Sequence, residues 1–388
     1  MIDFAQLRRW PDVEAPELVA HDATDRLLLD TAEEALVAHP GHVTVIGDRY
    51  GALTLGAVSM LEPVGGGSDH LVGPVRVHQD ARSGELALVA NAARLGLSTP
   101  TPGRPEAPSA WVSGPLDASL LAGARVVLLQ LPRGLDALDE IAELVAAHAD
   151  PDVRLFAGGR VKHMAVAMND VLRRHFGEVQ AGLARQKSRV LTASAPLTRS
   201  GPSWPRSERH DDLVVVAHGA AFAGASIDIG TRALLEALAV EDPRADHVVD
   251  LGCGTGVLGV TYARAHPRAR LVATDQSAAA VASAVATAEA NGVADRMEVR
   301  RDDAGASLPA GSADLVLLNP PFHVGATVHA GIAYKLFDAA ARVLRPGGEL
   351  WCVWNSPLGY RPALQRIIGP TRQVSRDARF TVTVSTRR

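Results

Sequence analysis

The chain has 388 residues, of which 47% are hydrophobic and 21% charged, and its formal net charge is −4. This length suits about two domains that each bury a core, and the composition excludes a disordered or low-complexity chain. The acidic N-terminus is not a secretory signal, no stretch has the roughly 20 apolar residues of a membrane span, and two distant cysteines, Cys253 and Cys352, fit a reducing cytoplasm.

The first half of the chain has the pattern of an α/β domain. Val43–Ile46, Val126–Pro132 and Val153–Phe156 are predicted strands, and Leu135–Ala147 is a predicted helix. Residues 194–210 are rich in Pro, Ser and Arg and show neither helical nor strand periodicity. We therefore predict a linker at 194–210 between a first domain at 1–193 and a second at 211–388.

The second half alternates strands and helices as a doubly wound, Rossmann-like α/β domain does. Its predicted elements are a strand at Val248–Leu251, a helix at Val257–Ala265, a strand at Leu271–Thr274, a helix from the N-cap Ser277 to Asn291, strands at Met297–Arg300 and Asp314–Leu318, a helix at Val328–Leu344, a strand at Glu349–Trp354 and an antiparallel edge strand at Phe380–Thr386.

The first half resembles a degenerate copy of the second. Its strand at residues 43–46 is followed by GDRYGAL, where the second half has VVDL followed by GCGTGVL, and its VVLLQLP corresponds to VLLNPP. The first copy lacks the glycine series and the Asn-Pro-Pro tripeptide. Duplication predicts that one half kept its chemistry and the other lost it, and convergence of two unrelated α/β domains is the alternative.

The glycines Gly252, Gly254 and Gly256 lie between a predicted strand and a predicted helix. Such a loop turns sharply and brings backbone N–H groups close to a ligand. The residues from Gly254 to Gly259 also satisfy GxGxxG, so a dinucleotide such as NAD is one interpretation.

Acidic side chains around this loop favour another ligand. Asp250 is placed to receive an ammonium group, which NAD lacks, and Asp275 ends the next strand, where a carboxylate can accept both hydroxyls of a ribose. Asp302 and Asp303 follow the third strand, where a carboxylate can accept an exocyclic N–H of adenine. An ammonium group, a ribose and an adenine together indicate S-adenosyl-L-methionine. Cys253 is interpreted as a small packing residue because no base accompanies it.

A second motif, Asn319-Pro320-Pro321-Phe322-His323, follows the strand that ends at Leu318. Ligands of open α/β sheets bind at the carboxyl ends of strands. The Asn319 side-chain oxygen and the Pro320 carbonyl can accept the N–H groups of a planar amine, and Phe322 can stack on its ring. His323 is either a substrate contact or a packing residue. The motif predicts methyl transfer to an amine by in-line displacement, with no metal site.

These motifs, together with Ile227-Asp228-Ile229-Gly230-Thr231 and WNSPLGY at 354–360, resemble class I S-adenosylmethionine-dependent methyltransferases. More specifically, they resemble the bacterial two-domain ribosomal RNA guanine-N2 methyltransferases, the small-subunit type C and large-subunit type G enzymes. The resemblance implies a seven-stranded catalytic C-terminal domain that follows a degenerate methyltransferase-like domain.

The resemblance also implies a role for each motif residue. Asp250, Gly252 and Gly254 would hold the methionine end of the cofactor, Asp275 the ribose and Asp303 the adenine, with Asp302 as the alternative. Asn319, Pro320 and Phe322 would hold the target base, and residues 228–231 would close over the cofactor. The stretch after His323 matches neither type well enough to choose between them.

The distribution of charged residues along the chain indicates what kind of partner the protein could bind. Residues 1–40 hold nine acids against three arginines, but residues 154–189 hold eight basic residues against two acids, and residues 361–388 hold seven arginines against Asp377. Either the basic segments are ordinary solvated surfaces, or they contact phosphates despite the acidic total. The resemblance implies ribosomal RNA or a ribosomal subunit as partner, with the target base in single-stranded, looped or flipped RNA.

We expect a monomer whose first domain holds the RNA through residues such as Arg160, Lys162 and Arg174. Three other functions remain open. The chain could methylate another planar amine, in DNA adenine or protein glutamine, although Phe322 favours a base. It could be a catalytically silent RNA-binding or assembly protein, which the intact acids and Asn319 argue against. An NAD oxidoreductase is disfavoured because no residue supplies the acid or base for hydride transfer.

Overall fold

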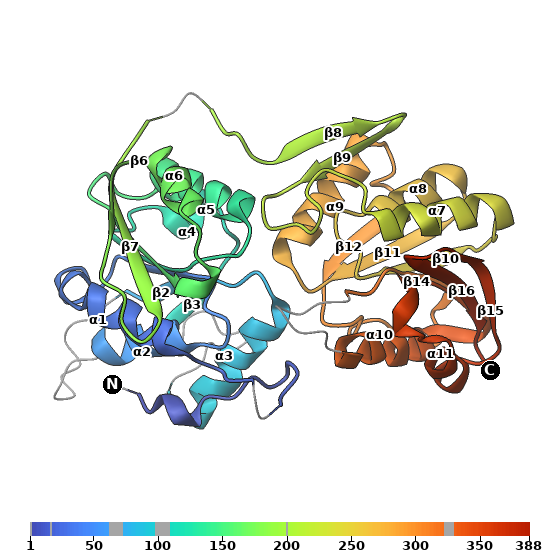
Figure 1. The fold of residues 1–388 in the computed structure, drawn as a ribbon, viewed down its shortest axis with the longest axis horizontal. Coiled ribbons are helices and arrows are strands. Elements are labelled where there is room, and N and C mark those ends of the chain that lie inside the picture. The colour runs from blue at the N-terminus through green and yellow to red at the C-terminus, as the bar shows by residue number, and fades with distance from the viewer. Residues whose placement is uncertain (1, 16–17, 62–72, 98–108, 199–200, 322–329) are drawn as a thin grey trace. The chain divides into compact units, whose positions relative to one another are not determined.

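In the computed structural model, the described residues are 2–15, 18–61, 73–97, 109–198, 201–321 and 330–388. They divide into two compact units, Met1–Ser203 and Trp204–Arg388. Each unit is built around one seven-stranded sheet with helices on both faces (Figure 1). Within the described ranges, no helix is long and apolar enough to cross a membrane.

The sheet of the first unit has the strand order β3-β2-β1-β4-β5-β7-β6. Its strands are β1 (Val43–Ile46), β2 (Val75–His78), β3 (Trp111–Ser113), β4 (Val126–Gln130), β5 (Arg154–Arg160), β6 (Phe176–Ala181) and β7 (Ser188–Pro196). Its helices are α1 (Ala23–Ala38), α2 (Ala52–Leu61), α3 (Arg82–Arg94), α4 (Ala118–Leu121), α5 (Leu135–His148) and α6 (Ala167–Arg173), with short 3-10 helices at Phe4–Gln6 and Val161–His163.

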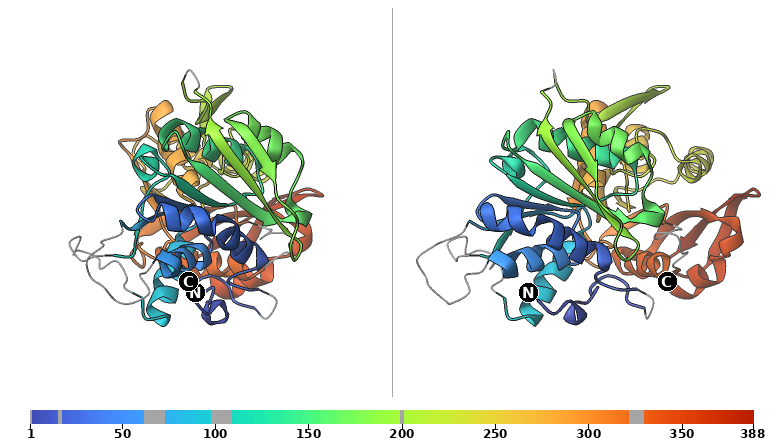
Figure 2. Two further views of the ribbon diagram at one scale, coloured as in Figure 1. Left: turned by 90° about the vertical axis from the view of Figure 1, so that its left-hand side faces the viewer. Right: turned by 60° about the vertical axis from the view of Figure 1, so that its left-hand side comes forward.

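Two apolar cores cover the two faces of this sheet. Neighbouring residues of β4 point to opposite sides: Leu128 packs with α1, α2 and α3, and Leu129 packs with α4, α5 and α6. Figure 2 shows the sheet between the blue helices α1–α3 and the green helices α4–α6. The strands β3, β2, β1, β4 and β5 are parallel. Strand β7 pairs antiparallel with both β5 and β6, so β7 alone of the seven runs in the opposite direction.

The sheet of the second unit has the order β12-β11-β10-β13-β14-β16-β15. Its strands are β10 (His247–Leu251), β11 (Arg270–Asp275), β12 (Met297–Arg301), β13 (Ala313–Leu318), β14 (Leu344–Asn355), β15 (Thr371–Arg376) and β16 (Phe380–Thr386), and a separate hairpin is formed by β8 (Arg206–His210) and β9 (Leu213–Ala217). The helices are α7 (Ile229–Glu241), α8 (Val257–Ala265), α9 (Ala278–Ala290), α10 (Ala330–Val343) and α11 (Arg361–Ile367), with a 3-10 helix at Ser356–Leu358.

The second sheet is also covered on both faces. Leu315 and Leu317 of β13 pack with α7, α8 and α9, whereas Val316 and Leu318 pack with α10 and α11. The order and the directions of its strands repeat those of the first sheet, with β10 in the place of β1 and β13 in the place of β4. The predicted α/β class, with a methyltransferase-like first half, is confirmed.

The predicted elements are confirmed within the described residues, and three of them, at residues 43–46, 257–265 and 380–386, have the predicted bounds. The prediction that Phe380–Thr386 is an edge strand is wrong, because β16 lies between β14 and β15. Its hydroxyl residues are buried: Thr383 and Ser385 are each 0% exposed. Alternation of threonine and valine therefore does not report alternation of exposure here.

The expected linker at 194–210 is shorter than predicted. Strand β7 continues to Pro196, β8 begins at Arg206, and the two units divide between Ser203 and Trp204. Strand β8 shows no apolar alternation because four of its five residues are exposed. Its partner β9 supplies the buried side chains of the hairpin, among them Leu213 and Val215.

Candidate functional site

The predicted site residues meet at one edge of the second sheet. Strands β12, β11, β10 and β13 are neighbours and run parallel, so their carboxyl ends lie side by side. Asp250 is the fourth residue of the five in β10, Asp275 ends β11, and Asn319 follows β13 directly. This is the edge at which open α/β sheets bind ligands.

The loop between β10 and α8 needs its glycines. Gly252, Gly254 and Gly256 have φ angles of +76°, +53° and +80°, and residues other than glycine rarely adopt such positive values. A Cβ atom on Gly252 or Gly254 would meet no atom within 4 Å, so space beside the loop is open. A Cβ atom on Gly256 would lie 3.0 Å from Ala284 Cβ, which shows how closely α9 approaches the loop.

Asp250 is a buried carboxyl group that is only partly satisfied. Its side chain is 0% exposed, and Oδ2 accepts a hydrogen bond from the backbone N–H of Gly259 at 2.8 Å. Oδ1 is buried and has no hydrogen-bond partner among the described residues. Burial, together with the charge of Asp275, raises the pKa of Asp250 to about 7, although the hydrogen bond from Gly259 N–H acts to lower it. An ammonium group would supply the donor that Oδ1 lacks, so the site fits the methionine end of S-adenosylmethionine.

Asp275 is fixed by backbone donors. Its Oδ2 accepts from Gly254 N at 3.0 Å and its Oδ1 accepts from Ser277 N at 2.9 Å. Ser277 caps α9, since its hydroxyl accepts from Ala280 N. The carboxylate is therefore tied both to the glycine loop and to the start of a helix. A carboxylate held at this place is of the type that can accept from a pair of ribose hydroxyls.

The two acids after β12 have different partners. Asp302 Oδ2 accepts from the N–H and hydroxyl of Ser307, at 2.8 and 2.7 Å, and so closes its own loop. Asp303 forms an ion pair with Lys335 of α10, with Nζ at 2.7 Å from both oxygens. The ion pair adds Lys335, which no sequence motif marks, and the choice of Asp303 over Asp302 as the adenine contact stays a prediction.

Asn319 is held by the start of α7. Its Nδ2 donates to Asp228 Oδ2 at 3.2 Å and to Thr231 Oγ1 at 3.1 Å. Asp228 is also the N-cap of α7, where Oδ2 accepts from Gly230 N and Thr231 N. Sequence reasoning placed residues 228–231 over the cofactor and missed this contact, because 88 and 91 residues separate the partners.

Pro320 is buried and Pro321 is exposed. Phe322 and His323 lie outside the described residues, so their predicted roles stay predictions. Cys253 is 8% exposed, and burial raises the pKa of its thiol well above the ordinary value, as a packing residue requires. Among the residues with described positions, no three His, Cys, Asp or Glu side chains form a group that could hold a metal ion.

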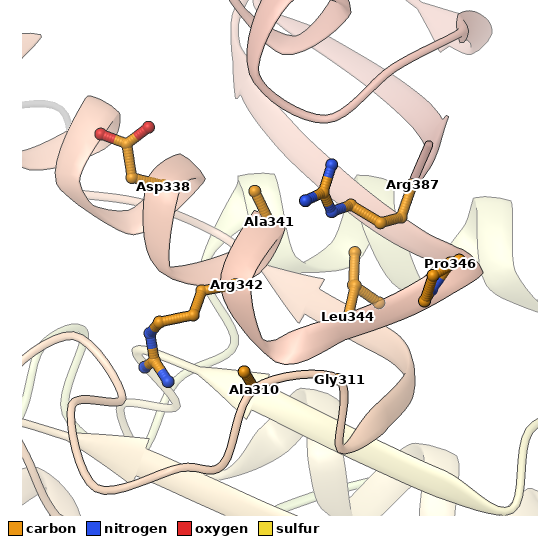
Figure 3. A pocket seen from close by; sticks show the side chains of 8 residues that line it. All are labelled: Ala310, Gly311, Asp338, Ala341, Arg342, Leu344, Pro346 and Arg387. Atoms are coloured by element: carbon orange, nitrogen blue, oxygen red, sulfur yellow. The ribbon is translucent and has the colours of Figure 1, made fainter.

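A surface hollow lies at the other edge of this sheet (Figure 3). Its lining comes from Gly311 before β13, from Asp338 and Arg342 of α10, from Leu344 at the start of β14, and from Arg387 after β16. These residues lie at the amino ends of β13 and β14. The hollow is therefore on the opposite edge of the sheet from Asn319.

The first unit has altered the corresponding positions. Gly47 N donates to His78 O at 3.0 Å, just as Gly252 N donates to Thr274 O at 2.8 Å, which aligns the two loops. By this alignment the first unit has Val45 in the place of Asp250, Arg49 in the place of Gly254, Gln79 in the place of Asp275 and Gln130 in the place of Asn319.

Side chains of the first unit form hydrogen bonds with the backbone of this altered loop. The Asp48 carboxylate is 1% exposed and accepts from Gly51 N at 3.1 Å and Thr54 N at 2.7 Å. Gln79 donates to the Asp48 carbonyl, and Gln130 donates to Asp25. Asp250, Asp275 and the Asn-Pro-Pro motif of the second unit are thus replaced at the aligned positions of the first unit.

Relatives and family models agree with this architecture. Residues 212–384 match the methyltransferase small domain and residues 2–197 match the RLMG N-terminal domain. Proteins named ribosomal RNA large subunit methyltransferase G are 36% identical in Streptomyces coelicolor (97% of this chain, 96% of that protein) and 36% identical in Pseudomonas paraeruginosa (98% and 97%). The chain belongs to this family.

The expected resemblance to two-domain ribosomal RNA methyltransferases is thereby confirmed, and the chain is a methyltransferase of the methyltransferase G family. Among solved structures, a 16S rRNA N2 methyltransferase from T. thermophilus, in complex with AdoMet and guanosine, matches with a TM-score of 0.71 and 22% identity, over 95% of this chain and 92% of that chain. That likeness shows that the two proteins share the two-unit fold.

Proposed function

We propose that this methyltransferase G family member transfers a methyl group from S-adenosyl-L-methionine to the exocyclic N2 amine of a guanine in large-subunit ribosomal RNA. The observation that carries the proposal is the placement of Asn319, with its amide nitrogen bound by Asp228 and Thr231, at the sheet edge that also carries Asp250 and Asp275. The names of the relatives support RNA of the large subunit as substrate.

The mechanism follows from the acceptors at this edge. When bound, S-adenosylmethionine supplies an electrophilic methyl group on a sulfonium. Asp250 would receive its ammonium group, Asp275 its ribose hydroxyls and Asp303 its adenine amine. The guanine N2 lone pair is delocalised into the ring, so the amine is a weak nucleophile. Hydrogen bonds from its two N–H groups to Asn319 Oδ1 and the Pro320 carbonyl would localise that pair on nitrogen.

Catalysis would then depend mainly on the position of the amine relative to the methyl group. In the proposed transfer the amine nitrogen would form a bond to the methyl carbon as the carbon–sulfur bond breaks, and the electron pair of that bond would go to sulfur. The extra proton on nitrogen leaves to solvent. No strong base is required, because the product amine cation is acidic, and orientation of the reacting atoms lowers the barrier.

The first unit is proposed to hold the RNA. The strands β1, β4 and β5 are neighbours in the first sheet, and their carboxyl ends are followed by Arg49, Arg133, Lys162 and His163, while Arg160 is the last residue of β5. The second sheet carries acids at the corresponding edge. Positive side chains there suit contacts to phosphates, whereas the acids suit the cofactor. By contrast, Arg174 pairs with Asp139, so it does not join this edge.

The deciding experiment is transfer of labelled methyl from S-adenosylmethionine to ribosomal RNA from a strain that lacks this gene, followed by mapping of the modified base. We expect label in large-subunit RNA at one guanine N2. Asn319→Ala should reduce transfer by about 100-fold or more, as loss of a transition-state hydrogen bond does, and leave cofactor affinity nearly unchanged.

Gln130→Ala is the matched control, because Gln130 holds the corresponding position in the first unit and should leave the transfer rate near that of the parent. Label in DNA or in protein, with none in RNA, would overturn the proposed substrate. Full transfer by Asn319→Ala would overturn the assigned role of the Asn-Pro-Pro motif.

A further inference from the structure

The orientation of the Asn319 amide is fixed by chemistry as well as by distance. A carboxylate only accepts hydrogen bonds, so the atom of Asn319 that faces Asp228 must be the amide nitrogen. The second N–H of that nitrogen meets Thr231 Oγ1. Both donors of the amide are therefore used, and within the described residues nothing donates to Oδ1. The oxygen is left to accept from a ligand.

Asp228 is itself held in place. The same Oδ2 that receives Asn319 also accepts from Gly230 N at 2.9 Å and from Thr231 N at 3.3 Å, at the start of a helix of 13 residues. The positive end of the helix stabilises the carboxylate charge. A fixed negative charge beside Nδ2 draws positive charge to the N–H side of the amide and shifts electron density towards Oδ1.

Gly230 keeps this arrangement open. A Cβ atom at that position would lie 3.0 Å from Asp228 Oδ2 and 3.4 Å from Asn319 Oδ1. Both separations are tight, so a side chain would push against the carboxylate and the acceptor oxygen. The three residues Asp228, Gly230 and Thr231 thus form one support for the Asn319 side chain.

We infer that Asp228 and Thr231 are positioning residues that orient the Asn319 amide and make its Oδ1 a stronger acceptor for the reacting amine. The inference rests on the proposed function, because it concerns the amine that receives the methyl group. Neither residue takes a proton: the nitrogen–carbon bond forms as the carbon–sulfur bond breaks, and the amine proton goes to solvent. Both residues act through Asn319.

The test uses the full-length protein with S-adenosylmethionine and ribosomal RNA. Asp228→Asn removes the charge but keeps a good helix cap, and Thr231→Val removes the hydroxyl at nearly constant volume. Each should lower kcat about tenfold, which corresponds to about 1.4 kcal/mol, with a smaller change in cofactor affinity and an unchanged midpoint of thermal unfolding. Thr231→Ser, which keeps the hydroxyl, should restore most of the rate lost in Thr231→Val.

Asp22→Asn is the matched control. Asp22 caps α1 in the first unit, where it accepts from Thr24 N, and its replacement should leave kcat at the parent value. Parent-like kcat in Asp228→Asn and Thr231→Val would overturn the inference, and so would a loss of stability or of cofactor affinity that accounts for the lower rate. If the parent transfers no methyl to RNA, the proposed function fails; if the parent is active and the variants match it, only the positioning role fails.

Discussion

Asp250 combines burial, an unpartnered oxygen and a raised pKa, and this combination predicts that cofactor binding depends on pH. In the free protein the pKa is about 7, because burial disfavours the carboxylate. An ammonium group against Oδ1 would favour the carboxylate and lower the pKa. Below pH 7 the free protein therefore carries a proton that binding must release.

The expected result is that S-adenosylmethionine affinity falls by about tenfold for each pH unit below about 7 and is nearly flat just above it. Calorimetry in buffers with different ionisation enthalpies would count the proton released on binding. Asp250→Asn should bind weakly and lose this pH dependence. The same slope in Asp250→Asn would show that another group titrates.

The proposed cofactor and base contacts were easier to locate in the sequence than the residues that support them. Asp250, Asp275 and Asn319 could be located because each lies at or directly after the carboxyl end of a strand. The partners of Asn319 and Asp303 could not, since Asp228 and Lys335 are distant in sequence and their residue types are common at helix starts and on helix surfaces. Only the packing of α7 and α10 against the sheet makes these pairs.

At the scale of elements, polar side chains on one face of α9 form hydrogen bonds with the backbone of β9, as a neighbouring strand would. Ser283, Thr287 and Asn291 recur every four residues and so share a face of the helix. Their side chains accept from the N–H groups of His218, Val216 and Val214, at distances from 2.9 to 3.0 Å, and two of them also donate to carbonyls of β9.

The backbone N–H and C=O groups of β9 that do not pair with β8 therefore have hydrogen-bond partners in α9. Sequence periodicity missed the hairpin because β8 has no apolar alternation, and it also missed the contacts between α9 and β9. Strand pairing is usually visible as a second apolar strand, but here the pairing groups are three polar side chains within an alanine-rich helix.

Thr287→Val should destabilise the second unit by about 1–3 kcal/mol, because it leaves the N–H and the C=O of Val216 without their partner. Amide hydrogen exchange at Val216 should accelerate, and the thermal midpoint should fall by a few degrees. Thr261→Val is the matched control, since the buried Thr261 hydroxyl has no hydrogen-bond partner among described residues and its loss should not destabilise. Equal effects of the two variants would contradict the role of the helix face.

At the scale of the whole molecule, two sheets with the same strand order carry opposite charges at corresponding edges. The similarity of residues 43–46 and 126–132 to segments of the second half predicted two related α/β domains, and the two sheets have the same strand order. The sequence could not predict the distribution of the basic run at 154–189, because only the fold reveals which cations are paired. Arg173, Arg174 and Arg185 have carboxylate partners, whereas Arg160 and Lys162 stand at the sheet edge.

The basic edge of the first unit is accessible. Arg49, Arg133, Lys162 and His163 are exposed, and Arg160 is half-buried. None of these five pairs with a carboxylate within the described part of the chain. Desolvation lowers the pKa of His163, and the charges of the other four lower it further, which shows that the cations act on one another.

Neutralising the basic residues of this edge should weaken RNA binding in proportion to the number of phosphate contacts that are lost. In the double variant Arg133→Gln, Lys162→Gln, the slope of log affinity against log salt should fall by about two, and affinity at physiological salt should fall roughly tenfold. Arg125→Gln, Arg154→Gln is the matched control, because these residues lie at the amino ends of β4 and β5 and their loss changes the charge equally.

Binding of labelled ribosomal RNA, measured over a range of salt concentrations, separates three outcomes. A lower slope in the first pair alone supports phosphate contacts at the carboxyl edge of the first sheet. Equal losses in both pairs would mean that RNA responds only to total charge, and parent-like affinity in both would place the RNA elsewhere. Cofactor affinity should stay constant in all variants, because every proposed cofactor contact belongs to the second unit.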